Sequence, residues 1–194
     1  MPVTLRLVSL AYLAAAPLTA QSVQPRDFTQ ADVDFVQGMI MHHAQAVTMS
    51  DWCATHGARA DLQILCKRIA LSQRDEIKVM RKWLLDRGQS APDPLQMSGM
   101  AMGDEKALMP GMLSSAEMQQ LDAARDTAFD RLFLNGMIKH HEGALSMVAT
   151  LFARPGGGQQ SDLFAIATDI DAGQRVEIAR MEAMLNTLTP NHSS

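Results

Sequence analysis

The sequence has few aromatic residues, no long basic stretch and no apolar run long enough to cross a membrane. Phe, Trp and Tyr make up 5% of the 194 residues, whereas Ala, Leu, Met, Gln and Glu are frequent, which favours helices over strands. The formal net charge of −4 and the lack of a basic stripe argue against nucleic acid as a partner. The lack of a phosphate-binding glycine loop, and of a Ser or Cys nucleophile paired with a base, argues against a kinase or a hydrolase.

The first 20 residues have the pattern of a secretory signal peptide. Arg6 is followed by an apolar stretch, Leu7 to Ala16, that is shorter than the roughly 20 residues of a membrane span. The stretch ends in small residues, so we expect cleavage after Ala20, with an uncleaved anchor as the alternative. The mature chain, 21–194, is then a single helical domain without a membrane span, located in the periplasm or secreted.

The sequence contains an internal duplication. The motif Phe-x-x-Gly-Met-Ile-x-His-His-x-x-Ala-x-x-Met begins at Phe35 and again at Phe133, 98 residues later. The motif Gln-Arg-x-Glu-Ile-x-x-Met begins at Gln73 and again at Gln174, 101 residues later. The chain therefore consists of two copies of one unit. Repeat one covers 29–88, a connector covers 89–113 and repeat two covers 114–188.

Each repeat is predicted to be an antiparallel helical hairpin. Thr29 with Asp32, and Ser114 with Glu117, have the spacing of helix capping boxes. Apolar residues at helical spacing predict helices over 29–57, 60–87, 114–153 and 161–188, with a candidate break in the third near Asp126. Two such hairpins make an all-α four-helix bundle, and the proline- and glycine-bearing connector is expected to be a loop.

Residues equally far from the turn of a hairpin lie at the same level, because both helices rise equally per residue. This rule pairs Met39 with Met80, His43 with Glu76, and Cys53 with Cys66 in the first hairpin, and Met137 with Met181 and His141 with Glu177 in the second. Helical periodicity turns these side chains toward the partner helix. In an exported chain the two cysteines are expected to form a disulfide, with a thiolate copper site as the alternative.

Thioether sulfur and imidazole nitrogen are ligands that suit Cu(I) and Ag(I). The candidate metal sets are Met39, His43 and Met80, and Met137, His141 and Met181, with Glu76 and Glu177 holding the second imidazole nitrogen. His42 and His140 point away, toward a flank or an adjacent helix. Methionine also fills apolar cores, but packing gives no reason for two adjacent histidines in both copies. We therefore favour copper binding.

The connector contains five methionines: Met97, Met100, Met102, Met109 and Met112. They show no helical apolar periodicity and are separated by glycines and prolines. Flexible thioethers suit the capture and transfer of Cu(I). The alternative is a loop whose methionines pack on the surface of the bundle.

Three segments, GMIMHHAQAVTM, MPGMLSSAEMQQL and FDRLFLNGMIKHHEGALSM, resemble the domain-of-unknown-function family 305 (DUF305), which includes CopM-type periplasmic copper-binding proteins. The resemblance covers about residues 28–188. It implies a ferritin-like four-helix bundle, export, and Cu(I) or Ag(I) binding linked to metal tolerance. The residues it implicates are the connector methionines with Met39, His42, His43, Met49, Met137, His140, His141 and Met147. The cysteine pair, and Lys139 in place of Met41, depart from this pattern.

The predicted function is therefore sequestration or transfer of Cu(I) or Ag(I), with the metal ion and a copper-handling protein as candidate partners. One alternative is a ferritin-like metal-dependent oxidoreductase, whose di-metal centre needs Glu-x-x-His motifs. Val79 and Arg180 stand where those histidines would be, although redox cycling of a bound copper ion stays open. The other alternative is a helical protein-interaction module that binds no metal.

Overall fold

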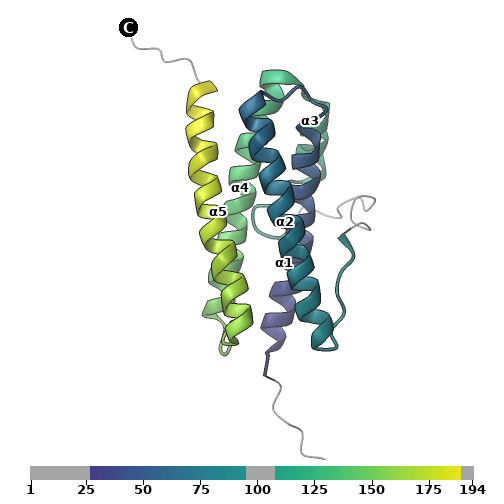
Figure 1. The fold of residues 1–194 in the computed structure, drawn as a ribbon, viewed down its shortest axis with the longest axis vertical. Coiled ribbons are helices and arrows are strands. Elements are labelled where there is room, and N and C mark those ends of the chain that lie inside the picture. Colours follow the sequence, from purple (N-terminus) through teal and green to yellow (C-terminus); the bar gives the residue numbers. More distant parts are fainter. Residues whose placement is uncertain (1–26, 95–107, 189–194) are drawn as a thin grey trace, which may run out of the picture.

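The computed structural model describes residues 27–94 and 108–188, and these two stretches contain five helices and no strand. The helices are α1 (Gln30–Trp52), α2 (Ala60–Asp86), α3 (Ser115–Ala123), α4 (Asp126–Ala153) and α5 (Ser161–Leu188) (Figure 1). The all-α class is thus confirmed. The predicted signal peptide and the connector methionines Met97, Met100 and Met102 lie outside the described residues. No helix within the described stretches is long and apolar enough to cross a membrane.

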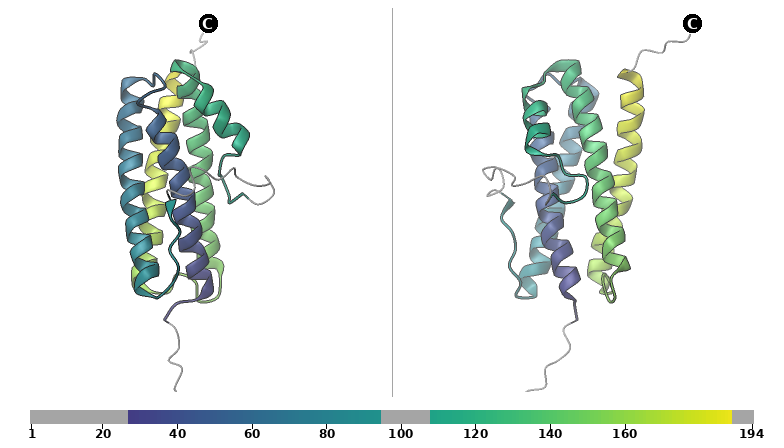
Figure 2. Two further views of the ribbon diagram at one scale, coloured as in Figure 1. Left: turned by 90° about the vertical axis from the view of Figure 1, so that its right-hand side faces the viewer. Right: turned by 180° about the vertical axis from the view of Figure 1, so that it is seen from behind.

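The long helices pair as the repeats predict. Helices α1 and α2 form one antiparallel hairpin, and α4 and α5 form the other (Figure 1). The two hairpins pack against each other mainly through α1 and α4, whereas α2 and α5 make little contact. The short α3 lies beside α1 and α4 (Figure 2). The interface between α1 and α4 therefore brings the two copies of the repeated motif together.

Both predicted capping boxes are present, and α2 and α5 begin at or within one residue of the predicted positions. The first helix, however, ends at Trp52 and not at Gly57. The Trp52 carbonyl accepts hydrogen bonds from the backbone N–H groups of Thr55 and His56, both at 2.9 Å, which closes a turn. Gly57 follows with a φ of 76°, a left-handed backbone conformation that residues with a side chain rarely adopt.

The third predicted segment is divided into α3 and α4. Ala124 and Arg125 are extended, and Asp126 has a φ of 53°. The Asp126 N–H donates to the carbonyl of His56 at 2.8 Å, so the break is held by the turn of the first hairpin. The candidate break point in the sequence is therefore a real one, and its cause is a tertiary contact.

Equivalent aspartates at the starts of α1 and α4 fasten the turn of the opposite hairpin. Asp32 accepts a hydrogen bond from the N–H of Gly158 at 2.7 Å, in the turn between α4 and α5. Asp130, the matching residue of the second copy, accepts from the N–H of Arg59 at 3.3 Å, just before α2. Both aspartates are buried. These two hydrogen bonds give the duplicated hairpins a reciprocal arrangement.

The disulfide between Cys53 and Cys66 joins the end of α1 to α2. Both cysteines are buried within the apolar cluster at that end of the molecule. Closing a loop of this length in the unfolded chain is worth about 3 kcal/mol in the loop-entropy description. The second hairpin reaches the same geometry without such a bond.

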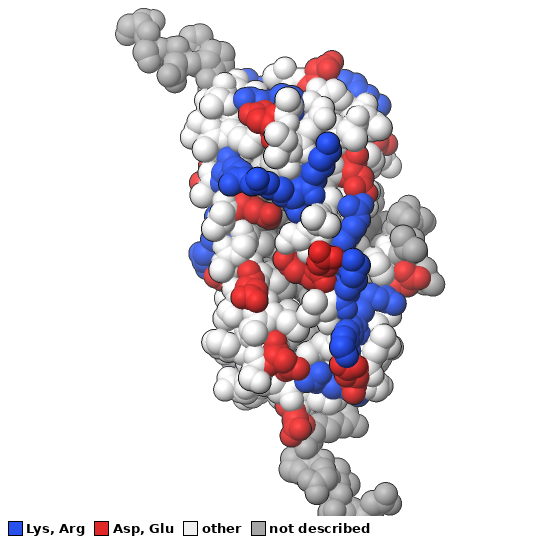
Figure 3. All heavy atoms as spheres, viewed as in Figure 1, with Lys and Arg blue, Asp and Glu red and all other residues white. Residues whose placement is uncertain are grey.

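The surface over α2 carries many lysines and arginines interleaved with acidic residues (Figure 3). Lys78 pairs with Asp75 at 2.8 Å, and Lys82 pairs with Asp86 at 2.7 Å. Exposed pairs of this kind contribute under about 1 kcal/mol each. The fold is therefore held chiefly by its buried clusters.

Candidate metal site

A buried polar layer separates two apolar clusters in the interior. Each long helix contributes two residues to it: His42 and His43 from α1, Gln73 and Glu76 from α2, His140 and His141 from α4, and Gln174 and Glu177 from α5. On every one of these helices, residues of one apolar cluster precede the pair and residues of the other follow it. All four histidines have an exposed fraction of 0%.

His43 and His141 each donate one hydrogen bond to a glutamate on the neighbouring helix. His43 Nε2 lies 2.6 Å from Glu76 Oε2, and His141 Nε2 lies 2.7 Å from Glu177 Oε2. These are the two contacts that the hairpin register predicts. Because a carboxylate oxygen only accepts, each Nε2 carries the hydrogen. Each buried Nδ1 has no hydrogen-bond partner in the described part of the chain.

His42 and His140 face each other across the interface between α1 and α4. Their ring centroids are 3.8 Å apart, and the rings are tilted by 39°. His42 Nε2 donates to the carbonyl oxygen of Pro110 at 2.9 Å, which leaves its Nδ1 without a partner among the described residues. The sequence indicated only that these histidines point toward a flank or another helix. Their meeting depends on how the hairpins dock.

Burial keeps the facing histidines uncharged. The pKa of His42 is lowered to about 3, chiefly by burial and in smaller part by the nearby His43 and His141, against the opposing hydrogen bond to Pro110. Burial likewise lowers the pKa of His140 well below its usual range. The pKa of Glu76 is raised by burial, but hydrogen bonds with His43 and Ser72 outweigh this and leave it lowered. Neutral imidazoles beside an ionised carboxylate can act as metal ligands at pH 7.

The lowered pKa of His42 predicts that the metal-free protein loses stability in acid. An unfolded histidine takes up its proton near pH 6.5, whereas folded His42 does so only at about 3. Between these two pH values only the unfolded state binds the proton. The contribution of His42 to the free energy of unfolding therefore falls by about 1.4 kcal/mol for each unit by which the pH is lowered. Urea unfolding at pH 7, 5.5 and 4 measures this slope, which His42→Gln is expected to reduce by about that amount. An equal slope in both proteins would contradict the assignment.

The methionines predicted to act as ligands are buried beside the polar layer. Met39 and Met80 belong to one apolar cluster, and Met137 and Met181 belong to the other with Met49. Each predicted thioether pair thus lies within one cluster. Met147 is half-buried against the first cluster, Met109 is half-buried and Met112 is buried.

Within 27–94 and 108–188, no group of three or more His, Cys, Asp or Glu side chains is placed to hold a metal ion. A di-metal carboxylate centre, as in ferritin-like oxidases, would need such a group. A metal in the polar layer would therefore need thioether ligands beside imidazole. Soft monovalent ions accept that combination.

The last part of the connector, residues 108–113, crosses the interface of α1 and α4 and is called the strap below. Gln45 holds it from α1: its Nε2 donates to the Leu113 carbonyl at 2.9 Å, and its Oε1 accepts from the Leu113 N–H at 2.8 Å. On α4, Gly143 leaves room for it, since a Cβ there would lie 2.0 Å from the Pro110 oxygen. Gln45 and Gly143 occupy equivalent positions in the two repeats. The strap therefore breaks the symmetry of the duplicated site.

Two buried residues of the polar layer were not identified as functional from the sequence. Gln73 and Gln174 have exposed fractions of 2% and 3%, and neither amide atom of either side chain has a hydrogen-bond partner in the described stretches. Buried amides without protein partners are uncommon, so both side chains are free to bond a water or an ion in the layer. The sequence pattern could have identified them, because each glutamine is the first residue of the second repeated motif.

Lys139, which replaces Met41 in the second copy, points away from the layer. Its Nζ forms an ion pair with Glu117 Oε1 at 2.7 Å, at the start of α3. Met41 is half-buried. The substitution therefore ties α4 to α3 within the second repeat.

These features define a duplicated all-helical protein with a layer of buried histidines and glutamines and half-buried glutamates, flanked by methionines. The chain belongs to the DUF305 family, because the family model for the Domain of unknown function (DUF305) matches residues 32–185. Among curated proteins, none matches it significantly.

Solved structures share this fold. A DUF305 fragment from Deinococcus radiodurans is 34% identical, with a TM-score of 0.69 over 82% of this chain and 98% of that one. A DUF305 protein from Streptomyces coelicolor is 27% identical, with a TM-score of 0.69 over 84% and 94%. CopM in its Cu(II)-bound form is 26% identical, with a TM-score of 0.65 over 81% and 97%.

Proposed function

We propose that this protein is an exported copper-binding protein that sequesters or transfers Cu(I), and also Ag(I), for metal tolerance. The observation that carries the proposal is the pair of buried Nδ1 atoms on His43 and His141, whose opposite ring nitrogens are held by carboxylates. This arrangement orients an imidazole toward a metal and raises its basicity. Buried thioethers beside it supply the sulfur that soft monovalent ions prefer.

The proposed ligands form one set in each hairpin, with the two glutamates as the orienting groups. The sets are Met39, His43 and Met80, and Met137, His141 and Met181. His42, His140, Met49 and Met112 would complete these sets, and Met109 and Met147 would pass the ion to them. Met97, Met100 and Met102, outside the described residues, keep their predicted role in capture.

Relatives support a role in metal binding at a coarse level. The family membership and the Cu(II)-bound form of CopM, at 26% identity, agree with copper as the ion. The preference for Cu(I) rests on the thioether ligands. We also infer a ferritin-like four-helix bundle with a methionine-rich connector. Export rests on the signal pattern of residues 1–20, and a copper-handling protein would exchange the ion.

Anaerobic competition with a chromogenic Cu(I) chelator tests the proposal. The mature protein is expected to remove Cu(I) from the chelator, so the absorbance of the complex falls in proportion to the protein added. X-ray absorption of the loaded protein is expected to show both nitrogen and sulfur ligands. No fall in absorbance at equimolar chelator would contradict copper binding and favour an interaction module.

A further inference from the structure

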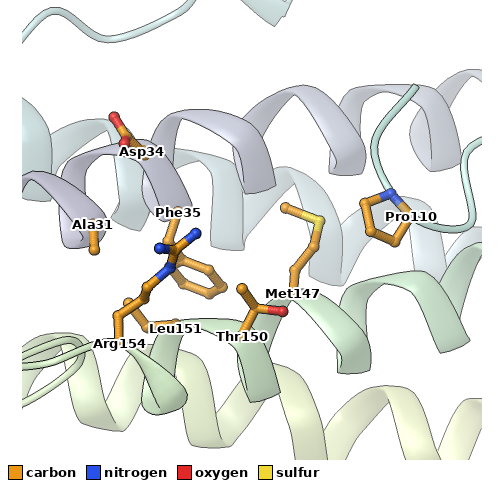
Figure 4. A pocket seen from close by; sticks show the side chains of 8 residues that line it. All are labelled: Ala31, Asp34, Phe35, Pro110, Met147, Thr150, Leu151 and Arg154. Carbon is orange, nitrogen blue, oxygen red and sulfur yellow. The ribbon is translucent and has the colours of Figure 1, made fainter. Parts of the chain in front are cut away.

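A solvent-facing cavity of about 440 Å³ lies between α1 and α4 on one side of the polar layer. Its lining comprises Ala31, Asp34, Phe35, Pro110, Met147, Thr150, Leu151 and Arg154 (Figure 4). Met147 and Pro110 lie together at one end of the cavity, away from the charged Asp34 and Arg154. Pro110 is also the strap residue whose carbonyl is bonded to His42. The cavity therefore reaches the strap residue bonded to the buried histidine pair.

Two thioethers converge beside this end of the cavity. A Cβ built on Gly38 would lie 3.3 Å from Met109 Sδ and 3.4 Å from Met147 Cε, so both side chains pack against the same glycine. Met109 and Met147 are both half-buried. Gly38 lies one helical turn before His42 on α1. Two half-buried thioether side chains thus meet at Gly38, one helical turn from His42.

The equivalent place in the other half of the molecule opens onto a smaller cavity, of about 180 Å³, lined in part by Gly136 and Leu113, but its thioether is buried. Gly136 matches Gly38 in the repeat, and a Cβ there would lie 3.1 Å from Leu113 Cδ2 and 3.5 Å from Met49 Cε. The strap thus supplies an isobutyl group where it supplies a thioether beside Gly38. Met49 has an exposed fraction of 0%. Of these two related positions, only the one at Gly38 therefore has two half-buried thioethers as its nearest neighbours.

We propose that Met109 and Met147 form the entry site through which a soft monovalent metal ion passes from this cavity to His42 and the polar layer. This proposal rests on the proposed function, because it supplies the route to the buried ligands. Thioethers carry no proton, so an ion can move from them to an imidazole by ligand exchange without a change of oxidation state or proton release.

Stopped-flow transfer of Cu(I) from its chromogenic chelator complex to the full mature chain tests the entry site. Met109→Leu and Met147→Leu keep the volume of the side chain but remove its sulfur. Each is expected to slow loading at least about tenfold, while the equilibrium affinity of the polar layer is retained. Met118→Leu, on α3 and outside the entry site, is the matched control and is expected to load at the wild-type rate.

A second variant tests the route without touching a sulfur. Thr150→Trp would fill the cavity from an exposed position, and it is expected to slow loading as well. If the wild-type chain takes up Cu(I) and all three variants load equally fast, the entry site is wrong, and the proposal of copper binding is unaffected. Loss of the equilibrium affinity in the leucine variants would also overturn it, since these sulfurs would then be the binding site itself. Failure of the wild-type chain to take up Cu(I) would instead contradict the proposed function.

Discussion

Replacing His43 and His141 together by glutamine is expected to weaken Cu(I) binding by at least about 100-fold. Loss of a group that merely orients a ligand costs about 10–100-fold in metal affinity, and loss of the ligand itself should cost more. Glutamine can still donate to Glu76 and Glu177, so the double variant removes the imidazole nitrogen without leaving the carboxylates unpaired. The affinity is measured by anaerobic competition with a Cu(I) chelator.

His56→Gln is the matched control for this experiment. His56 is also buried, with an exposed fraction of 5%, but it lies outside the repeated motifs and bonds to Asp122 at the end of α3. Its replacement is expected to leave Cu(I) affinity unchanged. Unchanged affinity in the His43→Gln/His141→Gln variant would show that these histidines are not ligands. It would then favour a structural role for both histidine–glutamate pairs.

Replacing Gly143 by alanine is expected to lower the free energy of unfolding by about 2 kcal/mol or more. The new Cβ would lie 2.0 Å from the Pro110 oxygen and 2.6 Å from Gly111 Cα, and neither backbone group can be avoided by rotating a side chain. The strap would have to move away from α4, and this movement would lengthen or break its hydrogen bonds to His42 and Gln45. Overpacking alone costs about 1–3 kcal/mol. Urea unfolding measures the change.

Gly173→Ala provides the control within the same chain. Gly173 lies inside α5, and a Cβ there meets nothing within 4 Å. Because alanine is the better helix former, this variant is expected to gain up to about 1 kcal/mol. A Gly143→Ala protein as stable as the wild type would mean that the strap is not held against α4. The opposite signs of the two variants thus separate the clash from the general effect of removing a glycine.

The helical class, the duplication and the DUF305 membership could be predicted from the sequence, because each depends on periodicity or motif and not on distant packing. The register within each hairpin was predictable for the same reason. Helices rise by a constant amount per residue, so counting from the turn placed His43 beside Glu76 and His141 beside Glu177. Helix ends held by distant contacts were predicted less well. The end of α1 shows this: the helix was predicted to run to Gly57 but ends at Trp52, and the turn that follows is bonded through the His56 carbonyl to Asp126 in the other hairpin.

The sequence alone determined which chemical groups each hairpin brings to one level, since local geometry repeats identically in both copies. Only the tertiary structure decided that His42 meets His140, that residues 108–113 cross beside this pair, and that Gly38, unlike the matching Gly136, packs against two half-buried thioethers. Those features arise where α1 packs against α4, and side-chain shape across the whole interface selects how two helices dock. No count along a single helix contains that information.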